Sequence, residues 1–374
     1  MGRPEKARRR EMTPLVHCLH PVGLAGGSRR DIREAASRRF VSVELPRRRC
    51  PTCAGLTYAN NCPNCKAQTY VESICPRCSK NYTDASECPL CKVPVLQYER
   101  RTVNLEESFN LACRNLHLSK PPDIVKGVRG LTSPTRTPEP IEKGILRAKY
   151  DLSVFKDGTI RFDVTNAPLT HFKPSEVGVS LERLRALGYQ YDCEENPLTN
   201  VDQLCALRIQ DIIVPHDCAE YLVRVASFID ELLEKLYRLP PFYRIRQKED
   251  LAGHVAIGLS PHTSVGVVAR IIGFTQAHVC FAHPLWHAAK RRDCDGDEDA
   301  ILLAMDVLLN FSKAFLPTRI GGLMDAPLLL TMATNPAEVA RQALNMDIAK
   351  STPLAFYEET QRRQDPNIAS DIVE

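Results

Sequence analysis

The chain has 374 residues, of which 44% are apolar and 25% charged, a composition typical of a soluble globular protein with room for two or three domains. The first 15 residues are polar and arginine-rich, which does not suit a secretory signal, and no apolar run reaches the roughly 18–20 residues that cross a bilayer. Residues 1–49 carry 13 Lys and Arg against 5 Asp and Glu, a local charge of +8, so the remainder sums to −4. A basic block beside an acidic centre favours a polyanion held near a metal site. A basic surface or arm that is only solvated is the alternative.

The N-terminal part predicts short elements. Residues 15–19 and 40–45 have the composition or alternation of strands, and residues 31–39 predict a short basic helix. After a cysteine-rich segment, residues 93–98 predict another strand and residues 105–116 a helix. The proline-rich segment 132–140 predicts a linker or exposed loop.

Four CxxC pairs lie between these elements, at intervals of eight, nine and nine residues. Each CxxC can form a knuckle that presents two thiolates, and two knuckles complete a tetrahedral Cys₄ zinc site. The sequence therefore predicts two structural zinc ions, most simply in consecutive zinc ribbons, with a cross-braced pairing still open. Redox CxxC motifs would need a surrounding βαβ pattern, which the sequence lacks. The predicted ligands are Cys50, Cys53, Cys62, Cys65, Cys75, Cys78, Cys88 and Cys91.

The central part predicts further strands and a long helix. Residues 145–164 predict a β-hairpin, because Asp157-Gly158 suits a type I′ turn and apolar residues alternate on both sides of it. An amphipathic helix is expected over 216–238, ending before Pro240-Pro241. Three glycine-punctuated runs then predict strands that bend tightly, as in a small barrel, and a helix is expected to follow them. The runs are 253–259, 265–274 and 277–281, and the helix is 299–315.

The stretch HPLWHAAKRRDCDGDED, residues 283–299, places three basic residues next to five acidic ones. Carboxylates this close repel one another unless cations or water compensate them. An EF-hand calcium loop is excluded, because its sixth position is Glu298 instead of glycine and its twelfth is Ala304 instead of glutamate. An acidic first helix turn in water is the simplest alternative to a metal site.

A catalytic Mg²⁺ site fits the stretch better. The spacing Asp293-x-Asp295-x-Asp297, with a glycine that allows a tight turn, lets carboxylates point at one hard cation. Nucleotidyl transfer needs such carboxylates to hold two metal ions, and nearby basic residues to neutralise a triphosphate. Lys290, Arg291 and Arg292 make that arrangement available, although only alternate side chains face one way.

Five segments of the chain resemble the large subunit of the archaeal family D DNA polymerase: MGRPEKA, EKGILRAKYDLSVFKDGTIRFD, HVAIGLSPHTSVGVVARIIGFT, AHPLWHAAKRRDCDGDEDA and GGLMDAPLLLT. The resemblance implies a mixed α+β fold with two double-psi β-barrels, like those of multisubunit RNA polymerases, inserted zinc ribbons and flanking helices. It implies that Asp295 and Asp297 are the catalytic Mg²⁺-binding pair. Asp293 stands where the family is expected to have asparagine, so it is either a third ligand, as in the DFDGD loop of RNA polymerases, or only a neighbour.

The same resemblance implies partners and a domain plan. Arg3 and Lys6 are implied phosphate or DNA contacts, beside Lys290, Arg291 and Arg292. The implied partners are primer-template DNA, dNTPs, a small subunit carrying a phosphoesterase-type proofreading exonuclease, and a sliding clamp, with no membrane and a cytoplasmic, nucleoid-associated location. Since the family subunit is longer, the chain is expected to be its central catalytic portion. The expected domains are a first barrel (1–49 with 92–180), two zinc ribbons (50–91), a helical connector (181–245), a second barrel with the acidic segment (246–330) and a helical tail (331–374).

Two other functions stay open at this stage. One is a zinc-ribbon nucleic-acid-binding module without catalysis, and the other is an RNA-polymerase-like enzyme of the same barrel architecture.

Four histidines and the remaining cysteines carry weaker expectations. His283 and His287 stand four apart and can share a helix face as metal ligands, although core roles are commoner, and His254 and His262 are possible DNA or nucleotide contacts. Cys294 lies between two aspartates, which disfavour a thiolate, so it is not expected to be a nucleophile. Buried apolar roles are expected for Cys18, Cys113, Cys193, Cys205, Cys218 and Cys280.

Overall fold

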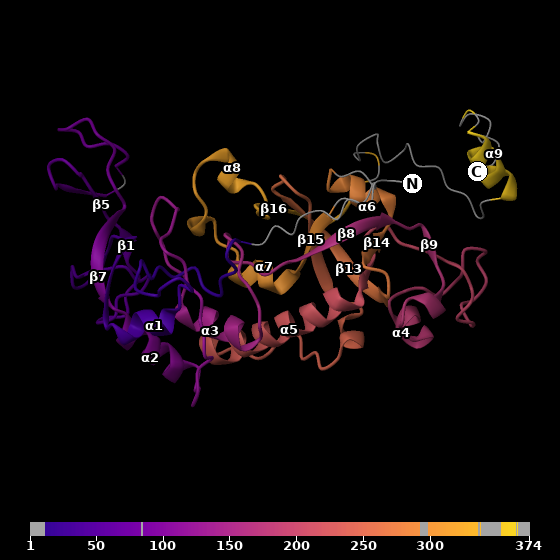
Figure 1. The fold of residues 1–374 in the computed structure, drawn as a ribbon, viewed down its shortest axis with the longest axis horizontal. Helices are drawn as coiled ribbons and strands as arrows, with labels where there is room; N and C mark the ends of the chain where they lie inside the picture. Colours follow the sequence, from indigo (N-terminus) through magenta and orange to yellow (C-terminus); the bar gives the residue numbers. More distant parts are fainter. Residues whose placement is uncertain are drawn as a thin grey trace.

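The computed structural model describes residues 12–83, 85–291, 298–335 and 353–363, together with positions 337 and 365. Its elements form a mixed α and β fold, as predicted, in two regions joined by a long helix (Figure 1). The N-terminal region lies at one end of the molecule and includes the cysteine-rich segment, whereas the second region is built around a large sheet. Among the helices of the described residues, none combines the length and the apolar character needed to cross a membrane.

The N-terminal region is built on an antiparallel strand pair. β1 (Phe40–Pro46) runs against β7 (Tyr98–Asn104) in one unbroken register. Three helices accompany this pair: α1 (Ile32–Ser37), α2 (Leu105–Asn115) and α3 (Ile141–Lys149). The sequence specifies where α1 and α2 begin, because Asp31 and Asn104 each accept a hydrogen bond from a backbone N–H of the first turn. The predicted strand 40–45 and helices 31–39 and 105–116 are therefore confirmed.

The cysteine-rich segment is inserted between β1 and β7. It contains a three-stranded sheet of order β3-β2-β4 and a separate β5–β6 pair, all of two-residue strands. These strands are β2 (Arg48–Arg49), β3 (Leu56–Thr57), β4 (Tyr70–Val71), β5 (Ser73–Ile74) and β6 (Asn81–Tyr82).

The second region is built on a seven-stranded mixed sheet of order β11-β14-β8-β15-β12-β13-β16. Because β11 pairs with both β14 and β13, six of these strands close into a ring, a small barrel to which β16 is added through β13. The strands are β8 (Phe162–Pro168), β11 (Asp211–Pro215), β12 (Val255–Leu259), β13 (Val265–Thr275), β14 (Val279–Ala282), β15 (Glu298–Leu303) and β16 (Leu329–Thr331).

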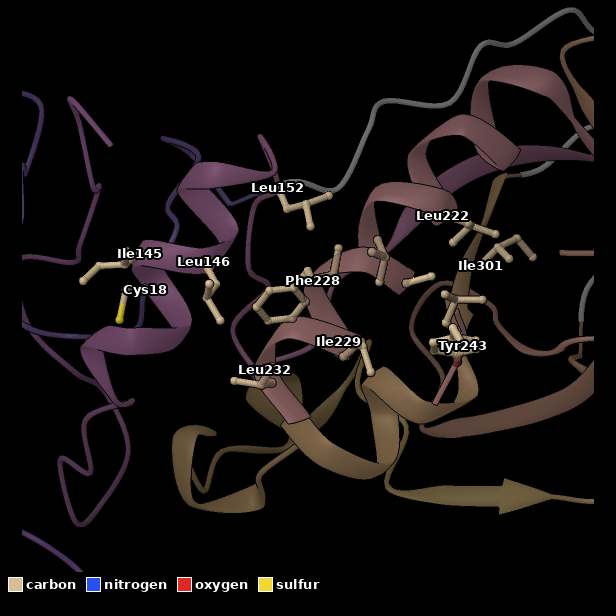
Figure 2. Packing of buried hydrophobic residues seen from close by; sticks show 14 of the residues in the cluster. Cys18, Ile145, Leu146, Leu152, Leu222, Phe228, Ile229, Leu232, Tyr243 and Ile301 are labelled. Carbon is tan, nitrogen blue, oxygen red and sulfur yellow. The ribbon is translucent and has the colours of Figure 1, made fainter. Parts of the chain in front are cut away.

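The long helix α5 (His216–Leu232) joins the two regions through one apolar core. Figure 2 shows Phe228 and Leu232 on the side of Leu146, which belongs to α3, and Leu222 on the side of Ile301, which belongs to β15. The helix pattern predicted over 216–238 is confirmed. It continues as a π-helical turn and ends at Arg238, whose left-handed backbone precedes the two prolines.

The remaining elements are short. A small unit formed by β9, β10 and α4 has its own apolar cluster, which includes Phe172, Leu184, Leu198 and Cys205. The elements are β9 (His171–Phe172), α4 (Leu181–Ala186), β10 (Cys205–Ala206), α6 (Pro284–Ala289), α7 (Ala304–Asn310), α8 (Ile320–Leu323) and α9 (Leu354–Arg362). Single helical turns cover Pro174–Glu176, Leu233–Tyr237, Lys248–Leu251 and Lys313–Phe315.

The predicted hairpin over 145–164 is wrong. Its first five residues, 145–149, belong to helix α3, which ends among basic residues, an ordinary helix signal, and residues 150–155 form no strand. A turn does occur at Asp157-Gly158, where Gly158 has a φ of 93°, but Asp157 is not among the residues with positive φ, so the turn is not type I′. The following strand β8 pairs with β14 and β15 instead.

The helix predicted over 299–315 is also wrong in its first part. Residues 298–303 form β15, and α7 begins only at Ala304. All six residues of β15 are buried, because both faces of the strand are covered: Ile301 and Leu303 belong to the main apolar cluster, and Ala300 and Leu302 belong to another. When almost every residue of a run is apolar, the sequence lacks the periodicity by which a strand is told from a helix.

Two short strands were predicted where the structure has none. Residues 15–19 are held by backbone bonds from His17 and Cys18 to the carbonyl oxygen of Lys126, with no ladder. Residues 93–98 form only isolated bridges, and the strand there begins at Tyr98. The three predicted strands 253–259, 265–274 and 277–281 are confirmed as β12, β13 and β14.

The closed ring takes strands from three of the regions expected as separate domains. β8 comes from the expected first barrel, β11 from the expected connector, and the others from the expected second barrel. Within the described residues we find one closed ring, while residues 12–49 and 92–161 contain the β1/β7 pair and helices, so the two expected double-psi barrels are not confirmed.

Candidate metal centres and the ion pair beside the acidic segment

The eight CxxC cysteines gather into two consecutive clusters. In each cluster the four sulfur atoms lie within 4.8 Å of one another, and the members are Cys50, Cys53, Cys62 and Cys65 in the first and Cys75, Cys78, Cys88 and Cys91 in the second. The described residues therefore show the consecutive pairing, and the cross-braced alternative is not formed.

The same backbone turn presents the sulfur atoms in all four knuckles. The N–H of the residue after the second cysteine donates to the carbonyl oxygen of the first, at 2.9–3.0 Å. That residue is left-handed in every knuckle, with φ between 51° and 60°, and the four residues are Ala54, Lys66, Ser79 and Lys92. A repeated local sequence, Cys-Pro-x-Cys, thus produces a repeated local geometry.

The sulfur spacing fits a tetrahedral metal ion. Zinc–sulfur bonds of ~2.3 Å place the sulfur atoms of a tetrahedral site about 3.8 Å apart. The Sγ atoms of Cys53 and Cys62 lie 3.6 Å apart and those of Cys78 and Cys88 lie 3.7 Å apart. Both clusters can therefore hold zinc, with four thiolates leaving no open position for catalysis.

Hydrogen bonding prepares some of these thiols to ionise. Bonding to the backbone of Cys53 lowers the pKa of Cys50 to about 6, and the bond from Cys50 raises the pKa of Cys65 to about 12.

The acidic segment is described only at its ends. The predicted metal ligands Asp293, Asp295 and Asp297 lie outside the described residues, together with Arg292 and Cys294. The implied DNA contacts Arg3 and Lys6 lie outside them too. What the structure does place are Lys290 and Arg291 before the segment and Glu298 and Asp299 after it.

Lys290 and Asp299 form a fully buried ion pair. Both side chains have 0% exposure, and the Lys290 ammonium contacts Oδ2 of Asp299. Oδ1 of Asp299 accepts a hydrogen bond of 2.7 Å from the Ser260 hydroxyl. The ammonium also lies 3.7 Å from the centre of the Trp286 ring. Lys290, predicted as a phosphate contact, thus has the Asp299 carboxylate as a partner, and the phosphate contact stays a prediction.

Arg291 has a different position. It is exposed, takes a left-handed backbone with φ of 61° after α6, and lines a cavity of about 760 Å³ with His262 and Thr334. Of the predicted phosphate contacts that the structure describes, Arg291 is the one whose side chain faces solvent.

The histidine candidates fall into two groups. Nδ1 of His283 caps α6 by accepting from the N–H of Leu285, and Nε2 of His287 lies 3.1 Å from the carbonyl oxygen of Ala167. Burial lowers the pKa of both rings, and neither joins a metal-ligand cluster within the described residues. His254 is half-buried against the Tyr243 ring, so of the four only His262 is exposed at the cavity.

The expected burial of the other cysteines is confirmed for Cys18, Cys205, Cys218 and Cys280. It is wrong for Cys193, which is exposed in a loop, and Cys113 is only partly buried.

Sequence reasoning missed two residues beside the ion pair of Lys290 and Asp299. Gly258 lies in β12 and Ser260 in the loop that follows it, and no local pattern links either of them to the acidic segment. One signal was the glycine at position 258 within an otherwise apolar strand. Another was Trp286, which stands four positions before Lys290, the spacing at which side chains meet on one helix face.

Comparison with known proteins places the chain among polymerase subunits. Residues 118–374 match the model described as DNA polymerase II large subunit DP2, catalytic domain, and residues 1–84 match that of its central domain. The whole chain aligns with proteins named DNA polymerase II large subunit, at 48% identity in Pyrococcus furiosus, 49% in Archaeoglobus fulgidus and 45% in Natronomonas pharaonis. The chain spans about a third of the length of these relatives, 30%, 33% and 32% respectively.

Proposed function

We propose, since this chain belongs to the family of the DNA polymerase II large subunit, that it forms the catalytic core of a replicative DNA-directed DNA polymerase. The reaction is nucleotidyl transfer from a dNTP to a primer 3′-hydroxyl. The observation that carries the proposal is that the acidic segment lies inside the 257 residues, 118–374, that match the catalytic domain.

Asp295 and Asp297 are the residues that we assign to Mg²⁺. Carboxylate oxygens are the ligands that Mg²⁺ prefers, and two of them on one short segment fit the ion. Bound Mg²⁺ would activate the primer hydroxyl and stabilise the pyrophosphate that leaves. Asp293 is either a third ligand or a neighbour that adds negative charge.

Basic residues complete the site in this proposal. Exposed Arg291, at the cavity, is placed to neutralise phosphate, and Arg292, Arg3 and Lys6 are assigned the same role from the sequence. The ammonium of Lys290 is occupied by Asp299, which argues against the phosphate contact first expected of it.

Zinc would have a structural part in the same protein. The two Cys₄ clusters hold the insertion between β1 and β7, and neither has an open coordination position. In the same proposal the six-stranded ring is one of the family's double-psi barrels. The small subunit, the sliding clamp and a cytoplasmic, nucleoid-associated location follow from the family resemblance alone.

Primer extension tests the function. Because the relatives are about three times as long, we would place this chain in a complete large subunit, replacing the matching third of the Pyrococcus furiosus protein, and add that protein's small subunit. The expected result is extension with dNTPs by the chimera, and loss of at least about a thousandfold in rate, the size of effect of removing an electrostatic catalytic group, for Asp295→Ala/Asp297→Ala.

Each rival predicts a different result in that assay. Extension with ribonucleotides in preference to dNTPs would indicate the RNA-polymerase-like enzyme. A chimera that binds primer-template but does not extend it would indicate the zinc-ribbon binding module without catalysis. A chimera that binds primer-template but extends it at the same rate with and without the two aspartates would remove the assignment of Asp295 and Asp297. The unmodified Pyrococcus furiosus subunit is the positive control for assembly.

A further inference from the structure

Lys290 and Asp299 flank the acidic segment, nine positions apart in sequence. We propose that their ion pair is a positioning device: it ties the end of α6 to the start of β15 and so holds the two ends of the segment that carries Asp295 and Asp297. The inference rests on the proposed function, because it takes these two aspartates as the Mg²⁺ ligands.

Asp299 is placed to position the segment and not to bind the metal itself. Its side chain has 0% exposure, and each carboxylate oxygen has a partner, Ser260 for Oδ1 and Lys290 for Oδ2. Its strand neighbours are fixed as well, since β15 pairs with β8 on one side and β12 on the other. The fifth acidic residue of the cluster therefore belongs to the barrel.

Lys290 is held on three sides. Its ammonium lies over the ring of Trp286, which has 0% exposure and donates its indole N–H to the carbonyl oxygen of Val268 at 3.2 Å. Gly258 makes room for both side chains: a Cβ there would lie 2.5 Å from the Trp286 ring and 3.0 Å from Cδ of Lys290. The position of the ammonium is thus specified by β12, β13 and α6 together.

Stability alone does not explain such a pair. Removing two charges from water costs several kcal/mol per ion, and well-packed apolar residues in place of a buried pair are often as stable or more so. What an ion pair adds is a defined direction and distance between the two chain segments. Groups that orient metal ligands from behind typically change metal affinity 10–100-fold when they are lost.

Mn²⁺ binding, followed by electron paramagnetic resonance on the full chain with its zinc sites loaded, tests the inference. The test variant is Lys290→Met/Asp299→Asn, which removes both charges together and leaves no unpaired buried ion. The matched control is Arg270→Met/Asp211→Asn, because Arg270 and Asp211 form an ion pair of 2.7 Å in the same ring, between β13 and β11. Asp295→Ala/Asp297→Ala reports binding at the proposed site.

We expect the test variant to bind Mn²⁺ about tenfold or more weakly than the wild type, at unchanged circular dichroism, while the control keeps wild-type affinity. Equal affinity of test variant and wild type would overturn the inference, as would an equal loss in the control, which would indicate general destabilisation. If the test variant does not fold, Ser260→Ala takes its place: it removes only the hydroxyl donor to Asp299, and an Mn²⁺ affinity equal to that of the wild type would then be the contradicting result.

The same data keep this inference apart from the proposed function. If wild type and Asp295→Ala/Asp297→Ala bind Mn²⁺ equally, the assignment of the metal ligands fails first. If Asp295→Ala/Asp297→Ala weakens Mn²⁺ binding but Lys290→Met/Asp299→Asn does not, only the positioning role of the ion pair is contradicted, and the proposed function is unaffected.

Discussion

In the two cysteine clusters the buried apolar side chains are the cysteines themselves, whereas in the ring most are Val, Ile, Leu, Ala and Phe. Among the described residues of 50–92 the buried apolar residues are Cys50, Cys62, Cys75 and Cys88, and the other buried side chains there are polar. By contrast, every residue of β15 is buried, and so are most of β12 and β13. The cysteine-rich segment therefore has candidate metal ligands at its centre, whereas the ring has an apolar core.

This difference predicts different responses to the same perturbation. A module without apolar burial gains its folding free energy from the metal, so it should fold and unfold with zinc. The ring gains its folding free energy from the burial of apolar side chains, so its stability should not depend on zinc. The single tryptophan, Trp286, lies in the ring region, so its fluorescence reports that region separately.

Zinc removal should have the largest effect and separate the two regions. Structural zinc contributes roughly 10–16 kcal/mol in small zinc domains, which is more than short strands can supply without it. We expect a strong chelator to unfold residues 50–92 and abolish the charge-transfer absorption of the Co²⁺-substituted protein, with little change in Trp286 fluorescence. Metal analysis should find two zinc ions per chain.

Two results would contradict that separation. One is fewer than two zinc ions per chain, and the other is a Trp286 unfolding midpoint that follows the metal content. Cys193→Ser, which changes an exposed cysteine outside both clusters, is the control and should leave the zinc content at two.

Truncation of a buried ion pair should have the next largest effect. Arg147 and Glu139 are both 0% exposed and joined by two bonds of 2.8 Å, and Arg147 also donates to the carbonyl oxygens of His17 and Gly158. Arg147→Met leaves a buried carboxylate without its partner, so we expect a loss of about 3–5 kcal/mol in the free energy of unfolding. Urea unfolding followed by circular dichroism measures it.

The comparison for Arg147 is an exposed pair in the same region. Arg39 and Glu106 approach to 3.0 Å, with the side chains 72% and 44% exposed, so Arg39→Met should cost less than about 1 kcal/mol. If the two variants lost similar free energies, burial would not be what gives the Arg147 pair its importance.

Acidification should change the stability of the two regions in opposite senses. Burial raises the pKa of Asp306, in α7, to about 6, above its usual 3.8. Between these values the folded state binds more protons than the unfolded state, so this contribution is full below about pH 4 and is lost as the pH rises through 6. Zinc thiolates respond in the other sense, because protons displace the metal as the pH falls.

The variant Asp306→Asn removes the titrating carboxyl group and so isolates its contribution to the free energy of unfolding. From pH 4 to pH 7 we expect the wild type to lose up to about 2–3 kcal/mol relative to the variant, at 1.36 kcal/mol for each unit of pKa. Trp286 fluorescence during urea unfolding at each pH measures the difference. A difference between the two proteins that does not change with pH would show that Asp306 titrates normally in the fold.

The sequence predicted the cysteine clusters better than the ring, and for a physical reason. The two cysteines of each knuckle are three positions apart, and the outermost cysteines of each cluster, Cys50 with Cys65 and Cys75 with Cys91, are no more than 16 positions apart. This spacing predicted the knuckles and the number of metal ions, although it left the pairing of the knuckles open. The ring closes through the pairing of β11 with β13, segments more than fifty residues apart, and no local pattern specifies that pairing. Fully buried β15 lacked the periodicity by which strands are recognised, and it was predicted as a helix.

The same reason applies to the acidic segment. Its charge pattern indicated a metal site, but Lys290 stood beside two arginines and was predicted to face phosphate. The burial of Lys290 against Asp299, and the bond from Ser260 to Asp299, depend on the pairing of β12 with β15, which no local pattern specifies. The order of residues in the sequence shows which charged side chains are neighbours along the chain. Which of them form ion pairs depends on which become buried together in the fold.

The smallest expected effect is that of a glycine substitution in a CxxC knuckle. Ala54 has a φ of 56°, and a left-handed conformation costs an L-residue roughly 1–2 kcal/mol, whereas glycine adopts it freely. Glycine also makes the unfolded chain more flexible, which offsets about 0.4–1 kcal/mol, so Ala54→Gly should favour the folded module by about 0–1.6 kcal/mol. Competition with a zinc chelator should then show affinity up to about fifteenfold tighter, at 1.36 kcal/mol for each factor of ten. In the ring, Gly258→Ala adds a Cβ 2.5 Å from the Trp286 ring and should destabilise, so the opposite signs of these two exchanges distinguish a backbone held by metal from one held by packing.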